Sequence, residues 1–307
     1  MPEQNDFSPE SGDRFPVDPI PANYFVKDPA FFVVLALGAL PLVVVSFEST
    51  SFRLNGMILL FALFWGWVFR DSLTKGVGGF LYPMLAFFFT GIAGLRFLLW
   101  TYRALPDSFV NLPHDGNSMV SLLGHIARTG FLEELCKLLP VILYLAEKRN
   151  RISPLTIIMI GVFSGLGFAA FENIQFSNHI IESGMLGIIN DAFHVDGLRT
   201  SESVGKGASL AMTVVLLRSL SLVFVHGVFG GISAYYLAAA LGGRHIILFL
   251  LLALSVSPVL HGVYDWACTI NLVAAAGVVA FSFMLFYGYL YVLLHPTATK
   301  PPCPGTS

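Results

Sequence analysis

The chain has 307 residues, of which 55% are hydrophobic and 12% are charged, and its mean hydropathy is +0.74. A water-soluble globule needs more surface charge than this, and a formal net charge of −2 leaves no basic excess for holding nucleic acid. The composition therefore predicts an integral membrane protein and argues against a nucleic-acid partner. The cysteines Cys136, Cys268 and Cys303 lack CxxC spacing, which excludes a thiolate zinc cluster and a disulfide framework.

The two ends of the chain are polar. Residues 1–28 are rich in proline and acidic side chains and contain no apolar run, so we expect a disordered tail and not a cleaved signal peptide. Residues 296–307 are also proline-rich and are expected to be a second disordered tail. Because no internal repeat separates the rest into two parts, residues 29–295 are expected to form a single integral-membrane domain.

Apolar stretches long enough to cross a hydrocarbon core of about 30 Å follow one another along the chain. They predict an all-α, polytopic membrane bundle of about eight transmembrane helices. The stretches are 31–47, 54–69, 77–100, 131–146, 155–176, 208–241, 246–270 and 272–295.

The basic residues of the predicted loops are distributed unevenly between the two sides of the membrane. Most of them share a side with the N-terminus, and the cluster Lys148, Arg149 and Arg151 is the most compact group there. Because cytoplasmic loops carry the excess of lysine and arginine, the pattern predicts that both termini are cytoplasmic.

Several ionisable side chains lie inside the predicted spans, where each costs about 2.5–3.5 kcal/mol even on the lenient insertion scale. Such groups must face one another or a wet cavity. Helical spacing brings some of them together, because Glu133 and Lys137 are i,i+4, Glu134 and Lys137 are i,i+3, and His261 and Asp265 are i,i+4. The full set is Arg96, Glu133, Glu134, Lys137, Glu172, Arg218, His226, His261 and Asp265.

The distance of each of these groups from the outer end of its predicted span gives an independent indication that they lie close together. At about 1.5 Å per residue, Glu133 lies about 3 Å, Glu172 about 6 Å, Asp265 about 8 Å and His261 about 14 Å from the outer ends of their spans. We therefore expect them to converge near the outer leaflet. His226 lies deeper by the same count, unless its long helix begins outside the membrane.

Imidazoles and carboxylates on different helices are the ligand types of a catalytic zinc site that keeps one position for water. A remaining glutamate would then act as the base, while Lys137 keeps its neighbouring carboxylates ionised. A metal-free arrangement is equally consistent with the residues: Glu133 activates water, and the imidazoles donate hydrogen bonds to the oxyanion. Arg218, two turns before His226, is expected to be a counter-ion for a site carboxylate.

Other readings of the same residues stay open at this point. Glu134 with Lys137, or His261 with Asp265, could simply be structural ion pairs between helices. A transporter that relays protons or metal ions also uses intramembrane carboxylates, although the chain lacks inverted repeats. A non-catalytic scaffold could bind other helices through glycine-rich faces.

Four motifs occur in order on separate predicted helices. They are Glu133-Glu134-x-x-Lys137, Phe168-x-x-x-Glu172-Asn173, His226 within a glycine-rich stretch, and His261-x-x-x-Asp265. With these motifs the chain resembles the PrsW intramembrane proteases, which are related to the CAAX prenyl endopeptidases.

This resemblance implies a peptidase in a bacterial cell membrane. It implies a substrate that is a single-pass membrane protein such as an anti-sigma factor, first cut near the extracytoplasmic face. Carried onto this sequence, the pattern assigns catalysis to Glu133 and Glu134 with Lys137 and Asp265 beside them. The other core polar groups, Glu172, His226 and His261, are the expected ligands of a divalent metal, with zinc as the hypothesis. Either Glu133 or Glu134 would be the base, and we favour Glu133.

Overall fold

The computed structural model describes residues 50–73, 79–148, 153–182, 201–241 and 245–294. Throughout these ranges the chain is helical and contains no strand. The predicted tails 1–28 and 296–307, and the predicted span 31–47, lie outside the described residues.

The helices follow one another along the described parts of the chain. The first half contains α3 (Thr50–Val68), η1 (Phe69–Leu73), α4 (Leu81–Phe89), η2 (Thr90–Gly94), α5 (Leu95–Ala104), α6 (Asp107–Val110), η3 (Leu112–His114), α7 (Ser118–Gly124), η4 (His125–Phe131) and α8 (Leu132–Glu147). The second half contains α9 (Pro154–Glu182), α11 (Ser201–Ala240), α12 (Ile246–Ala253), α13 (Val256–Ile270) and α14 (Leu272–Leu294).

Six helices of the described residues are long and apolar enough to cross a membrane. They are Phe52–Asp71, Leu81–Ala104, Pro154–His179, Thr213–Ala240, Ile246–Ile270 and Leu272–Leu294. The structure thus supports an all-helical integral membrane protein, but the predicted count of about eight spans is not confirmed. The predicted span 131–146 corresponds to α8, which is a helix of only 16 residues with Glu133, Glu134 and Lys137 in its first half.

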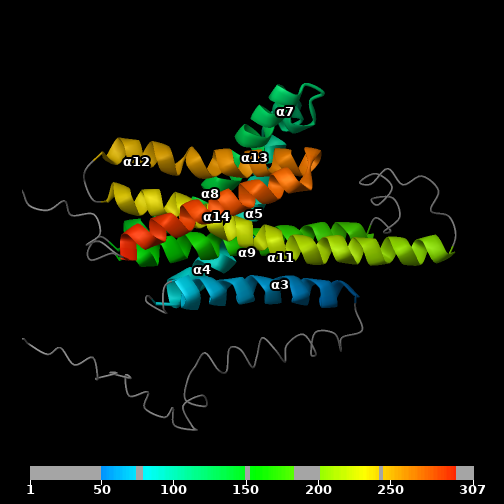
Figure 1. Cartoon of the computed structure of the whole chain (residues 1–307), viewed down its shortest axis with the longest axis horizontal. Helices are drawn as coiled ribbons and strands as arrows, with labels where there is room; N and C mark the ends of the chain where they lie inside the picture. Colours follow the sequence, from blue (N-terminus) through cyan, green and yellow to red (C-terminus); the bar gives the residue numbers. More distant parts are fainter. Residues whose placement is uncertain (1–49, 74–78, 149–152, 183–200, 242–244, 295–307) are drawn as a thin grey trace, which may run out of the picture.

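Helix α9 is the centre of the bundle. Its span window is 89% buried, whereas that of α14 is 17% buried. Figure 1 shows α9 and α11 running lengthwise through the middle, with α3 on one side and α12, α13 and α14 on the other. An apolar core joins α9 and α11 to α3, α4 and α14, and includes Phe69, Phe163, Leu166 and Phe286.

Glycines let α9 and α11 touch through their backbones. A Cβ on Gly165 would collide with the carbonyl of His226, and a Cβ on Gly161 would collide with the carbonyl of Gly230. Small residues at such crossings allow the close approach that drives helix association in membranes. The position of the His226 backbone is therefore set by direct contact with α9.

The helix that leads into Glu133 is π-helical. Segment η4, His125–Phe131, adjoins α8 directly and packs against α13, where a Cβ on Gly130 would strike the carbonyl of Pro258 and a Cβ on Gly262 would strike Ile126. Wide π turns inside helices are frequent at functional sites. This contact fixes α13, which carries His261, against the start of α8.

Candidate active site

The structure brings together the seven residues that the resemblance assigns to the site. Arg218 pairs with Glu172 beside them, whereas Arg96 of α5 is exposed. Helix α8 supplies Glu133, Glu134 and Lys137, α9 supplies Glu172, α11 supplies His226, and α13 supplies His261 and Asp265. Helix α8 contacts α9, α11 and α13, and α11 also contacts α9 and α13. The first and last of these residues, Glu133 and Asp265, are 132 positions apart in the sequence, so only the tertiary fold assembles the cluster.

Glu134 is the most fully bonded carboxylate of the cluster. Its Oε1 accepts from Lys137 Nζ at 2.5 Å and lies 3.0 Å from His261 Nδ1, while its Oε2 accepts from Ser257 Oγ at 3.3 Å. The Glu134 side chain is 1% exposed and that of Lys137 is 0% exposed. A buried carboxylate that already has three donors is satisfied, and Glu134 therefore holds the site together.

The bond to Glu134 sets the state of His261. A carboxylate can only accept, so Nδ1 carries a hydrogen, and when the ring is neutral its Nε2 presents a lone pair on the other side. That Nε2 lies 3.6 Å from Glu133 Oε2 and 3.4 Å from Asp265 Oδ2. Three acceptor atoms facing one another require a proton or a cation between them.

Glu133 is buried without being bonded. Its side chain is 9% exposed, and its Oε2 has no hydrogen-bond partner in the part of the chain that the structure describes. An unsatisfied buried carboxylate oxygen costs free energy, and such exceptions occur where a water, an ion or a substrate belongs.

Glu172 and Arg218 form the more open edge of the site. Arg218 donates from Nη2 to Glu172 Oε1 at 3.4 Å and from Nε to Asn173 Oδ1 at 3.3 Å, and its guanidinium stacks over Phe176. Arg218 therefore lies where a counter-ion of the Glu172 carboxylate is expected. The Glu172 side chain is 31% exposed and that of Asp265 is 21% exposed, whereas both histidines are 1% exposed.

His226 lies between aromatic rings and the other histidine. Its ring stacks on Phe168 at a centroid distance of 5.8 Å and meets the His261 ring edge-on at 4.7 Å. Its Nε2 is 4.0 Å from Glu172 Oε2, and its buried Nδ1 has no hydrogen-bond partner among the described residues. Helix α11 is 40 residues long, more than a bilayer requires, and it places the His226 ring in direct contact with the His261 ring.

One group of side chains has the geometry to hold a metal ion. Ligand atoms of Glu133, His226 and His261 all lie within 4.8 Å of one another, and all three residues are buried. Two imidazoles and one carboxylate form the protein ligand set of many catalytic zinc sites, with the fourth position left for water. The hydrogen bond from His261 Nδ1 to Glu134 is the outer contact that typically orients a metal-binding histidine.

This group differs from the ligand set expected from the sequence. Glu133 joins the two histidines in place of Glu172, which lies beside His226 with an unpartnered Oε2. The unpaired atoms of Glu133, Glu172 and His226 make the site a chemical fit for a cation, because all are lone-pair donors in a buried space. Glu133 thus combines the position of a ligand with that of a base.

Sequence reasoning missed Ser257 and Ser164. Ser257 Oγ donates to the Phe229 carbonyl at 2.7 Å in addition to its contact with Glu134. Ser164 Oγ donates to the Lys137 carbonyl at 2.6 Å and bonds Thr90 Oγ1 at 2.7 Å. The sequence could have indicated Ser257, because positions 257, 261 and 265 are four residues apart and share one face of α13.

The structure is that of a polytopic helical membrane protein with a buried cluster of carboxylates and imidazoles, which are the side chains that a membrane-embedded metallohydrolase requires. The chain belongs to the PrsW family of intramembrane metalloproteases: the family model matches residues 79–293, a range that contains all four motifs. Neither the curated proteins nor the solved structures contain a significant match to the chain.

Proposed function

We propose that this chain is an endopeptidase that hydrolyses a peptide bond of a membrane-anchored protein inside the bilayer. The observation that carries the proposal is the buried Glu133 Oε2, which lacks a hydrogen-bond partner in the described structure and lies 3.6 Å from His261 Nε2. A carboxylate held in this way is placed to take a proton from water as the water attacks a carbonyl carbon. His226 beside it can donate a hydrogen bond to the oxyanion that forms, and His261 can do so once its Nε2 has taken up a proton.

The other residues have supporting roles in this proposal. Lys137 keeps Glu134 ionised, and Glu134 keeps the His261 ring in one tautomer and one orientation. Arg218 holds Glu172 at the open edge of the site. The partly exposed Glu172 and Asp265 mark the side from which water and the substrate backbone approach.

In a metal-dependent form, Glu133, His226 and His261 would hold the ion, with zinc as the first candidate. When bound, such an ion lowers the pKa of a coordinated water toward neutrality and polarises a carbonyl oxygen. Glu172 and Asp265 then remain as the carboxylates that can receive the proton. The metal content of the protein decides between this form and the glutamate-dependent one.

We further propose a topology and a class of substrate. Glu133 is the second residue of α8 and Lys148 directly follows the end of this helix, so about 22 Å of helix separates Glu133 from Lys148. With that cluster in the cytoplasm of a bacterial cell, both termini are cytoplasmic and the cut falls in the extracytoplasmic half of the membrane. A single-pass membrane protein such as an anti-sigma factor is the substrate that fits this placement and the family resemblance.

The test compares the membrane proteomes of cells that express wild type, Glu133→Gln or the control variant Asp107→Asn, in which an exposed acid of α6 is neutralised. We expect a single-pass protein that is shortened with wild type and with the control but stays intact with Glu133→Gln. Sequencing the new terminus locates the cut. Identical proteomes at equal expression would refute peptidase activity, and a cut on the cytoplasmic side would refute the placement.

A further inference from the structure

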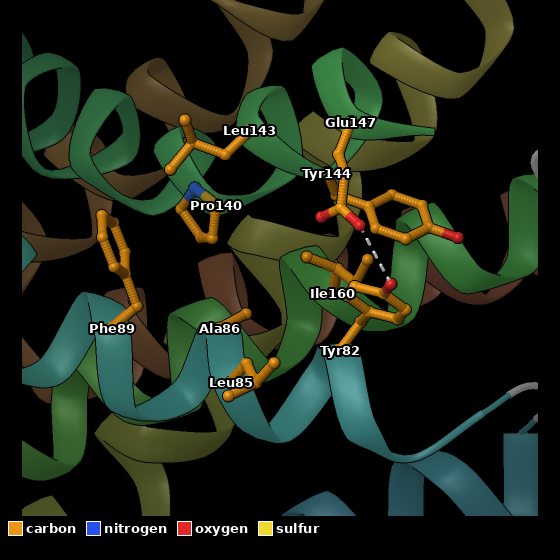
Figure 2. A pocket seen from close by; sticks show the side chains of 9 residues that line it. All are labelled: Tyr82, Leu85, Ala86, Phe89, Pro140, Leu143, Tyr144, Glu147 and Ile160. Carbon is orange, nitrogen blue, oxygen red and sulfur yellow. Dashed lines mark hydrogen bonds between the residues drawn. The ribbon is translucent and has the colours of Figure 1, made fainter. Parts of the chain in front are cut away.

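A second recess lies away from the active site, between α4 and α8. It has a volume of about 170 Å³. Figure 2 shows side chains of α4 on one wall and of α8 on the other, with Ile160 of α9 between them. The lining residues are Tyr82, Leu85, Ala86, Phe89, Pro140, Leu143, Tyr144, Glu147 and Ile160.

The recess is elongated and has two chemically different ends. On α4 the lining positions run from 82 to 89, and on α8 they run from 140 to 147, so each wall is about 10 Å long and follows the helix axis. Phe89 and Pro140 form the apolar end, whereas Tyr82 and Glu147 form the polar end. Leu85 and Leu143 are each 55% exposed, so the recess opens sideways from the bundle toward the lipid.

The polar end carries both signs of charge and two aromatic rings. Glu147 Oε1 accepts from Lys148 Nζ at 2.9 Å and from the Tyr82 hydroxyl at 3.3 Å. The Lys148 ammonium lies 5.4 Å above the Tyr82 ring, which meets the Tyr144 ring edge-on at 4.8 Å. The hydrogen bond from Lys148 holds the pKa of the Glu147 carboxyl below its ordinary value, so this end presents an ionised carboxylate beside an ammonium, with both side chains exposed.

We propose that this recess binds a glycerophospholipid with an ammonium–phosphate headgroup, such as phosphatidylethanolamine, with one acyl chain between α4 and α8. The recess is about 10 Å long and can cover the larger part of an acyl chain, which crosses about 15 Å of one leaflet, and it runs along the helix axes as lipid chains do in a bilayer. The headgroup ammonium meets Glu147 and the faces of Tyr82 and Tyr144, and its phosphate meets Lys148. Tyrosines at this level are typical of the membrane interface.

The recess is connected to the active site by hydrogen bonds. Phe89, at its apolar end, precedes Thr90, whose hydroxyl bonds Ser164, and Ser164 donates to the Lys137 carbonyl. Thr90 and Ser164 are each 0% exposed and Lys137 is 1% exposed, so these hydrogen bonds are buried from solvent. A lipid that fixes the distance between α4 and α8 thereby also fixes the helix that holds Glu133 and Glu134.

The test uses the full chain in nanodiscs of phosphatidylglycerol. Either phosphatidylethanolamine or phosphatidylglycerol with a photoreactive acyl chain is added at low mole fraction, and cross-linked peptides are identified by mass spectrometry. With the phosphatidylethanolamine probe we expect peptides 82–89 and 140–147 to be labelled about fivefold more than the exposed surface of α14. The phosphatidylglycerol probe is expected to give no such enrichment.

Substitutions of residues that line the recess, each compared with a control outside it, test whether the labelling depends on the recess. Leu143→Trp fills the recess from an exposed position and is expected to abolish the enrichment, whereas Leu251→Trp on the exposed face of α12 leaves it unchanged. Lys148→Gln and Glu147→Gln are expected to remove the headgroup preference, and the control Arg103→Gln is not.

Three results would overturn the proposal: equal labelling of the recess and α14, enrichment with the phosphatidylglycerol probe, or displacement of the probe by unlabelled oleate but not by unlabelled phosphatidylethanolamine. The readout is binding and involves no cleaved substrate. Failure of the lipid site and failure of the proposed peptidase activity are therefore distinguishable.

Discussion

The Nδ1 atom of His261 lies 3.0 Å from Oε1 of Glu134, the same oxygen that accepts from Lys137. This contact joins α13 to α8 across 127 residues of sequence and turns the Nε2 of the ring toward Glu133. The two adjacent glutamates therefore have different environments: Glu134 is bonded on both oxygens, and Glu133 faces the imidazole with an unpartnered oxygen.

The first prediction separates the two glutamates by stability. Glu134→Gln leaves Lys137 buried without its counter-ion, and we expect a loss of about 3–5 kcal/mol in the free energy of unfolding. In metal-free protein, Glu133→Gln removes a carboxylate whose Oε2 has no hydrogen-bond partner among the described residues, so we expect the free energy of unfolding to change by no more than about 1 kcal/mol, together with a fall in cleavage rate of about 10²–10⁴-fold. Thermal unfolding in detergent and cleavage of the substrate found by proteomics measure both. Equal destabilisation by the two substitutions would contradict the assignment.

The second prediction concerns the Glu134–Lys137 pair as a unit. Lys137→Met alone is expected to destabilise the protein about as much as Glu134→Gln, because each leaves one buried charge unpaired. The double variant Glu134→Gln/Lys137→Met is expected to recover at least half of that loss, since neither charge remains. Unfolding of the four proteins gives the coupling energy. Additive losses would show that the charges act independently.

The third prediction concerns bound metal. In purified wild-type protein we expect about one zinc ion per chain, and we expect Glu133→Gln, His226→Gln and His261→Gln to lower the zinc content. Glu172→Gln and the exposed control His114→Gln are expected to retain it. Elemental analysis after removal of free metal provides the measurement. Active wild type without metal would identify Glu133 as the base of a metal-free site.

The fourth prediction tests the contact that places His226. A methyl group on Gly165 would occupy the space of the His226 carbonyl, so Gly165→Ala is expected to cost about 1–3 kcal/mol and to reduce cleavage. Gly277 of α14 has nothing within 4 Å of an added Cβ, and Gly277→Ala is expected to be neutral or to stabilise by up to about 1 kcal/mol. Thermal unfolding of the two variants is the comparison. Similar effects of both would mean that helix propensity outweighs packing at position 165.

Residue spacing predicted a large part of the site, because helical periodicity is local. The i,i+3 and i,i+4 relations placed Glu134 beside Lys137 and Asp265 beside His261 before any tertiary information was used. Spacing does not distinguish Glu133 from Glu134, since either can reach Lys137. That choice depends on where α13 lies relative to α8, which is a property of the whole bundle.

Counting apolar stretches predicted the number of membrane spans less well, because that number also depends on how the helices pack in the whole bundle. The apolar stretch 131–146 does form a helix, but α8 continues directly from the π-helical η4 and carries three charges near its start. A hydropathy scan scores each stretch as if it were a single helix surrounded by lipid. The charges on α8 are tolerated because α9, α11 and α13 enclose them. Likewise, a straight count along one helix cannot include the packing that brings the His226 ring into contact with His261.

The distance in sequence between Glu134 and His261 has a consequence for biogenesis. At about 5–20 residues per second, a ribosome needs about 6–25 s to make the 127 residues between them. During that interval Lys137, one turn away, is the ionic partner that α8 supplies to Glu134 from within itself. The pair therefore enters the membrane as a neutral unit, and the site is completed only when α13 is inserted and docks.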